Sequence, residues 1–118
     1  MPYMLLINEP VGQRAERGLD KRHEVYARMV AFSKELKARG VLEATQSLAS
    51  TRHATQVRVH NGRATLTDGP FAEAKEMVGG FFLLNCETRD EALAIAKECP
   101  AAEWATVEVR QIGPCYED

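Results

Sequence analysis

The sequence predicts an α+β fold of the ferredoxin-like, split β-α-β type, with one inserted β-hairpin. Runs with strand and helix character follow one another in the order strand, helix, strand, hairpin, strand, helix, strand. Two helices cannot cover both faces of a sheet of this size, so both should pack on one face. The other face carries apolar positions, and we expect a homodimer to bury it.

The totals limit the protein to one domain and few partner classes. The chain has 118 residues, enough for one core, and 15 basic against 17 acidic side chains. Mixed charge of this kind argues against nucleic acid. No signal sequence and no apolar run of about 18 residues is found, so we expect a cytoplasmic protein without membrane contact.

The cysteines do not indicate a metal or redox centre. They number three and are widely spaced, without the short paired spacings of zinc ligands. We therefore expect reduced thiols, two of them buried, and no metal or cofactor. The three are Cys86, Cys99 and Cys115.

The N-terminal third reads as a strand, a loop, a helix and a second strand. Residues 3–7 form a short apolar run that fits a central strand, and residues 8–20 have loop composition. Asp20 offers an N-cap, and Gly40 marks the end of the helix. Residues 41–48 are a plausible second strand. Apolar residues repeat at helical spacing between these two ends: Val25, Met29, Phe32 and Leu36.

The middle of the chain predicts a β-hairpin. Residues 55–60 alternate apolar and polar, and the following Asn61-Gly62 is a strong signal for a two-residue turn. Residues 63–67 should return antiparallel. The alternation predicts that two side chains face the helices, Val57 and Val59.

The C-terminal part predicts a strand, a capped helix and a last strand. Gly79-Gly80 permits a bulge or a close backbone approach before the buried strand at residues 81–84. A capping box opens a helix at residues 88–91, which Pro100 ends. Residues 106–110 alternate as a strand with its valines inward, and Trp104 should close the core nearby.

The densest group of turn formers and ionisable residues lies at residues 67–76, Thr-Asp-Gly-Pro-Phe-Ala-Glu-Ala-Lys-Glu. Gly69 before Pro70 should leave the helical region, Asp68 can accept backbone hydrogen bonds, and Phe71 should be buried as an anchor. This stretch resembles the motif of the DGPF-domain, or YCII-related, family. The resemblance runs from the first strand to the last, and it implies ferredoxin-like domains whose sheets pair face to face as a dimeric α+β barrel.

The resemblance also implies a catalytic histidine at the start of the first helix, where this chain has His23 followed by Arg28. A helix N-terminus favours neutral imidazole, the form that a general base needs. The alternative is a solvated surface histidine. The wider family has an aspartate before the proline that ends the second helix, and here Cys99 stands there. Asp68 is the available substitute, or it is only an Asx-turn acceptor.

Three further side chains are candidate substrate contacts. Arg58 and His60 lie on the hairpin face opposite the valines, where Arg58 could clamp a carboxylate or pair with Glu108 or Glu43. Lys75 could bind an anion or belong to a solvated charged turn.

Two functions follow from the resemblance. The first is a lyase- or hydrolase-like enzyme acting on a small organic molecule, with His23 and Asp68 lining a common cleft near the dimer interface. Some relatives eliminate halide from hydroxylated aromatic compounds. The second is a non-catalytic module that binds a metabolite or acts in sigma-factor signalling.

Overall fold

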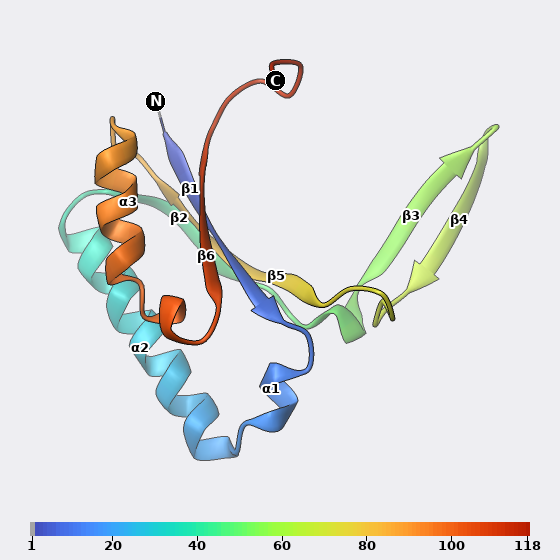
Figure 1. The fold of residues 1–118 in the computed structure, drawn as a ribbon, viewed down its shortest axis with the longest axis horizontal. Helices are drawn as coiled ribbons and strands as arrows, with labels where there is room; N and C mark the ends of the chain where they lie inside the picture. Colours follow the sequence, from blue (N-terminus) through green and yellow to red (C-terminus); the bar gives the residue numbers. More distant parts are fainter. Residues whose placement is uncertain (1) are drawn as a thin grey trace.

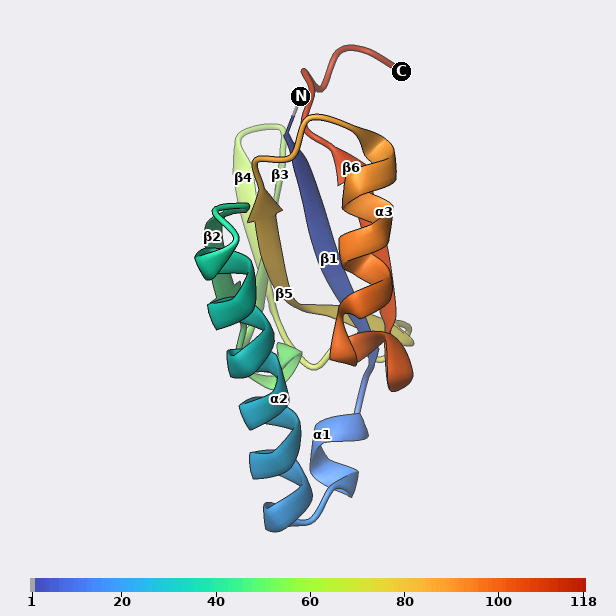
Figure 2. The same cartoon turned by 90° about the vertical axis from the view of Figure 1, so that its left-hand side faces the viewer.

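The structure, a computed structural model, describes residues 2–118 and contains a four-stranded antiparallel sheet in the order β2-β5-β1-β6. Both long helices lie on one face of this sheet (Figures 1 and 2). This is the ferredoxin-like arrangement that the sequence predicts. Its elements are β1 (Tyr3–Pro10), α2 (Leu19–Ala38), β2 (Leu42–Ser47), β5 (Glu76–Leu84), α3 (Arg89–Glu98) and β6 (Thr106–Gln111).

The remaining elements connect or extend this sheet. They are the short helix α1 (Gln13–Glu16), the 3₁₀ turns η1 (Thr51–His53) and η2 (Pro100–Glu103), and the hairpin strands β3 (Thr55–His60) and β4 (Arg63–Asp68). The hairpin forms a separate two-stranded sheet that stands apart from the rest of the molecule (Figure 1). No helix within residues 2–118 has both the length and the apolar character needed to cross a membrane.

The core lies between the sheet and the helices. Alternate residues of β1 face it, among them Leu5, which is fully buried. Phe32 of α2 packs edge to face on Phe82 of β5, with ring centroids 5.3 Å apart. Trp104, Val107 and Val109 pack against the cluster from the C-terminal end of the chain, as expected.

The segment predicted as a loop, residues 8–20, is more ordered than its composition indicates. Strand β1 continues to Pro10 because Asn8 and Glu9 pair with β5, and α1 follows. Helix α2 begins at Leu19 with Gly18 as its N-cap, so the predicted cap at Asp20 is wrong.

Helix α3 begins and ends as predicted. The Thr88 hydroxyl accepts a hydrogen bond from the Glu91 amide at 3.2 Å, and Pro100 opens the 3₁₀ turn η2 after the helix ends. Cys86 and Cys99 are buried and Cys115 is exposed.

The hairpin has the predicted strands and turn, but its valines do not face the helices. Asn61 and Gly62 take positive φ angles of 50° and 76°, as a tight turn of this kind requires. Val57 and Val59 are 61% and 68% exposed because the hairpin projects away from the core. Alternation shows which side chains share a face, and it does not show what that face meets.

The glycines of the motif and of β5 permit close approaches. A Cβ atom at Gly69 would lie 1.8 Å from the carbonyl oxygen of Thr51.

Asp68 accepts a hydrogen bond from the Thr55 hydroxyl at 2.8 Å, which ties the ends of β3 and β4 together. Phe71 is only half-buried, so the expectation of a fully enclosed ring is wrong.

Candidate functional site

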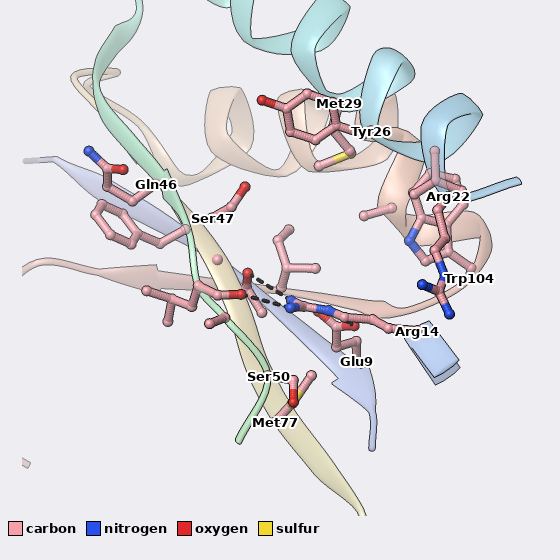
Figure 3. Close-up of a pocket in the computed structure, with 18 of the residues that line it drawn as sticks. Glu9, Arg14, Arg22, Tyr26, Met29, Gln46, Ser47, Ser50, Met77 and Trp104 are labelled. Atoms are coloured by element: carbon pink, nitrogen blue, oxygen red, sulfur yellow. Dashed lines mark hydrogen bonds and ion pairs between the residues drawn. The ribbon is translucent and has the colours of Figure 1, made fainter. Parts of the chain in front are cut away.

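A pocket lies near the end of β1, bounded by α1, α2, β5 and the segment that leads from β2 to the hairpin (Figure 3). Its volume is about 1120 Å³. We call it the arginine pocket, after the arginines that line it: Arg14, Arg17, Arg22 and Arg52.

A buried carboxylate lies in the wall of the pocket. Glu9 follows Leu5 and Ile7 in the alternation of β1, so its side chain points to the helix side of the sheet. Only 7% of the residue is exposed. A charge in this place needs a partner, because burial of an isolated carboxylate is costly.

Arg14 of α1 is that partner. Its Nη2 donates to Glu9 Oε1 at 2.7 Å and its Nε donates to Oε2 at 3.0 Å, a bidentate pair. Nη1 donates to the Leu48 carbonyl at 2.8 Å, and Nη2 also reaches the Gly79 carbonyl at 3.3 Å. One guanidinium thus joins β1, β5 and the segment after β2.

Gly79 makes room for this ion pair. The register of β1 and β5 shifts between Ile7, which is opposite Gly80, and Asn8, which is opposite Val78. Gly79 is the extra residue of this bulge, and a Cβ there would lie 1.6 Å from Glu9 Oε1. The bulge and the close approach at the glycine pair are therefore both confirmed.

The lining of the pocket is strongly cationic. Lys34 joins the four arginines, which gives five cationic side chains against one carboxylate, Glu9. The whole chain, in contrast, has a net charge of −2. Cationic groups are thus concentrated here, and a cleft of this kind attracts anions.

Apolar, aromatic and uncharged polar side chains make up the rest of the pocket. Tyr26 and Met29 project from α2 on one side, and Gln46 and Ser47 lie on β2 (Figure 3). The lining thus combines cationic groups with apolar and uncharged polar surface.

Trp104 lies at the edge of the pocket between cationic partners. The guanidinium carbons of Arg17 and Arg28 lie 5.7 and 5.4 Å from its ring centroid. Arg28 also forms an ion pair with Glu103, and the hydrogen bond from Arg28 lowers the pKa of the Glu103 carboxyl. These contacts tie α1 and α2 to η2.

The predicted catalytic residues are not among the pocket-lining residues. His23 is exposed on α2, one residue beyond Arg22, which does line the pocket. Asp68 is exposed at the end of β4, bonded to Thr55. The histidine that lines the pocket is His53.

The predicted substrate contacts also lie outside the pocket. Arg58 and His60 are exposed on β3, where they pair across the ladder with Thr65 and Arg63. Lys75 lies just before β5, and its carbonyl accepts from the Val11 amide.

Cys99 stands in the position where the wider family has an aspartate. Its thiol is buried, and burial raises the pKa of Cys99. A protonated thiol carries no charge to orient or stabilise an imidazolium.

Sequence reasoning missed the central pair, Glu9 and Arg14. The signal was the alternation of Leu5, Ile7 and Glu9, which continues past the point where the apolar run ends. The apolar run ends at Ile7 and the composition of the following residues indicates a loop, although Glu9 is a buried residue of β1.

Three comparisons place the chain among known proteins. The model of the YCII-related domain matches residues 1–115. An uncharacterised protein of Rhizobium meliloti (strain 1021) is 39% identical over 75 residues, which are 62% of this chain and 60% of the relative's length. The chain therefore spans less than two thirds of that relative.

A solved structure shares the fold. It is the 5-chloro-2-hydroxyhydroquinone dehydrochlorinase (TftG) from Burkholderia phenoliruptrix AC1100, in complex with 2,5-dihydroxybenzoquinone. The TM-score is 0.53 at 16% identity, over 96% of this chain and 94% of the other. The likeness shows a shared fold, and the family match, which covers almost the whole sequence, shows that the chain belongs to the YCII-related family.

Proposed function

We propose that the arginine pocket binds a small organic anion and that the protein acts on this anion as a lyase- or hydrolase-like enzyme. The observation that carries the proposal is the charge of the lining, five cationic side chains against one carboxylate. That carboxylate, Glu9, is already paired with Arg14, so the other cations have no buried partner of opposite charge in the lining. An incoming anion supplies one.

The class of anion follows from the apolar part of the lining. Tyr26 and Met29 offer apolar and aromatic surface for a planar ring, and the volume leaves room for one. The dehydrochlorinase of the same fold was solved with 2,5-dihydroxybenzoquinone, a planar compound with acidic hydroxyl groups. Extending this ligand class to the present chain is part of the proposal.

The roles of individual residues divide into two groups. Arg22 and Arg52 are the proposed anion contacts because both line the pocket and neither is paired with a carboxylate in residues 2–118. The acid–base roles of His23 and Asp68, and the substrate contacts at Arg58, His60 and Lys75, stay predictions. The binding proposal does not depend on them.

We also propose a homodimer. The sheet face turned away from the helices carries partly exposed apolar residues, which one chain leaves uncovered. Since Met4 pairs with Leu83 and Leu6 with Phe81, these side chains form one surface. We call Met4, Leu6, Phe81 and Leu83 the open sheet face.

A non-catalytic binding module is the second candidate, and two observations favour it. Both oxygens of Glu9 are held by Arg14, which leaves this carboxylate poorly placed to take a proton. Cys99 supplies no charge in place of the family's aspartate. A pocket of this kind can bind an anion without transforming it.

Calorimetric titration with 2,5-dihydroxybenzoquinone tests binding. The compound is ionised at neutral pH, so we expect it to bind and the uncharged hydroquinone to bind at least tenfold more weakly. Arg22→Gln and Arg52→Gln should each weaken binding, whereas Arg63→Gln, which removes a cation from the hairpin, should not. No binding by the wild-type protein would overturn the proposal.

Chloride release from 5-chloro-2-hydroxyhydroquinone tests the reaction. The reaction is a net loss of HCl: two hydroxyl groups lose their protons and become carbonyls, and one of these protons replaces the departing chloride on the ring carbon. The released chloride and the hydroxyquinone can both be measured. Release by the wild-type protein supports the enzyme. Tight binding without release of chloride would favour the binding module. In the enzyme case, the His23→Ala and Asp68→Asn variants test the two predicted acid–base roles by their rates of chloride release.

A further inference from the structure

The β3–β4 hairpin has one apolar face and one polar face. Val57 is opposite Leu66 in the ladder and Val59 is opposite Ala64, so these four side chains share a face. The other face carries Arg58 opposite Thr65 and other polar residues. The three large apolar side chains, Val57, Leu66 and Val59, are 61%, 65% and 68% exposed.

Residues 2–118 leave this apolar face largely uncovered. Strands β3 and β4 contact each other extensively and no other helix or strand to a comparable extent. An isolated two-stranded hairpin is at best marginally stable in water. A well-formed, apolar and uncovered ribbon therefore indicates a surface that another molecule covers.

The hairpin stands on the same side of the molecule as the open sheet face. In Figure 1 the long helices α2 and α3 lie to the left of the sheet and the hairpin to the right, and in Figure 2 the hairpin lies behind the sheet. Two uncovered apolar surfaces thus border one side of a single chain. Any molecule that covers the sheet approaches the hairpin as well.

The size of the exposed surface fits a second copy of the chain. The chain exposes 8471 Å², whereas a compact monomer of this mass exposes about 6400 Å². Its radius of gyration is 16.2 Å, against about 13.5 Å for a compact domain of this length. The excess, about 2000 Å², is of the size that each subunit of a permanent dimer buries.

We propose that the hairpin is an arm that clasps a second copy of this chain with Val57, Val59 and Leu66. The inference rests on the proposed homodimer and extends it beyond the open sheet face. In a two-fold symmetric dimer each contact occurs twice, so the arm of each copy lies on the other copy. The apolar face of the hairpin and the open sheet face are then covered in both chains.

The clasp also bears on the arginine pocket. The Gly69 amide donates to the Ala54 carbonyl at 2.8 Å, which closes the root of the arm. Thr51 packs so tightly on Gly69 that a Cβ would lie 1.8 Å from its carbonyl oxygen. Residues 51–53 line the pocket, so a partner that holds the arm also holds this part of the pocket wall.

Sedimentation velocity on matched variants tests the arm. Val57→Lys with Val59→Lys places two charges on the apolar face, and Gln56→Lys with Thr65→Lys places two charges on the polar face of the same ribbon. We expect a dimer for the wild type and the control, and a dimer dissociation constant at least tenfold higher for the valine variant. Circular dichroism should show that the helices are retained in all three.

The possible results distinguish three proposals: the clasp by the hairpin arm, the homodimer and the anion-binding pocket. A monomeric wild type at micromolar concentration overturns both the dimer and the clasp. The clasp is overturned, and the dimer retained, if the valine variant dimerises as tightly as the wild type while Leu6→Lys with Leu83→Lys is monomeric. Failure to bind 2,5-dihydroxybenzoquinone overturns only the pocket proposal.

Hydrogen exchange on the unmodified protein covers the case in which the valine variant unfolds its own hairpin. Amides of residues 55–68 should exchange more slowly at concentrations where the dimer forms than after dilution below its dissociation constant. Equal exchange rates in the two states would show that the partner does not contact the arm.

Discussion

Arg14 holds both carboxylate oxygens of Glu9, with Nη2 2.7 Å from Oε1 and Nε 3.0 Å from Oε2. Because the remaining donors of Arg14 reach the carbonyls of Leu48 and Gly79, the pair joins three segments that are far apart in the sequence. It is both a structural clamp and part of the pocket wall.

Replacing Arg14 alone by Leu should lower the free energy of unfolding more than replacing Arg14 and Glu9 together. The single variant leaves a buried carboxylate unpaired, at a cost of about 1.5–3 kcal/mol, given that Arg14 is partly exposed. Arg14→Leu combined with Glu9→Gln removes the charge and should recover part of the loss. Urea unfolding of the two variants checks this, and equal stabilities would show that the buried charge contributes little.

Gly79→Ala should be destabilising because the new Cβ would lie 1.6 Å from Glu9 Oε1. Overpacking of this kind costs roughly 1–3 kcal/mol, and more where backbone must move. Gly113→Ala is the matched control, since nothing lies within 4 Å of a Cβ there. Glu9→Ala should partly rescue the Gly79 variant, because the nearest atom in the collision belongs to the Glu9 side chain.

The glycine and the aspartate of the Asp68–Phe71 motif should differ in their effects. Gly69→Ala directs a Cβ at the backbone of Thr51, which cannot swing aside as a long side chain can, so a large loss of stability is expected. Asp68→Ala removes one exposed hydrogen bond from Thr55 and should cost no more than about 1 kcal/mol. Thermal melts that rank these two variants in the opposite order would contradict this account.

Thiol labelling should distinguish one cysteine from the other two. Burial raises the pKa of Cys86 and of Cys99, so both stay protonated and shielded at neutral pH, while Cys115 is exposed. Native protein should therefore react rapidly at one thiol with a disulfide reagent, and at all three in guanidinium. Fast reaction of Cys99 in the native state would contradict the buried position.

The contribution of the Arg28–Glu103 ion pair should disappear in acid. The hydrogen bond from Arg28 lowers the pKa of Glu103, so the folded state favours the ionised carboxylate. Stability from this group is present above the unfolded pKa and is lost as the pH falls through the folded value. Glu103→Gln should lower the unfolding midpoint at pH 7 and leave it nearly unchanged at pH 3.

The fold could be read from the sequence because its signals are local. Helix spacing from Val25 to Leu36, the capping box at Thr88 and the Asn61-Gly62 turn each have one physical interpretation. Gly79-Gly80 also predicts the bulge and the close approach, because glycine within a strand often marks one or the other.

The pocket could not be read in the same way because it depends on contacts between distant residues. Arg14 meets carbonyls 34 and 65 residues further along the chain, and no spacing rule predicts such partners. The family resemblance drew attention to His23 and Asp68, while Glu9 and Arg14 lie in a stretch whose glycines and charges indicate a loop. The direction of the valine face of the hairpin was missed for a related reason, since it depends on where the whole ribbon stands.

Trp104 is the single tryptophan of the chain, and it lies at the rim of the arginine pocket. All indole emission of the protein therefore comes from this one place. A quinone bound in the pocket would lie close to the indole ring and quench its fluorescence. The fraction of occupied pockets can therefore be measured from the emission of Trp104, without a label and at low protein concentration. The fluorescence of Trp104 would thus report binding of the proposed ligand.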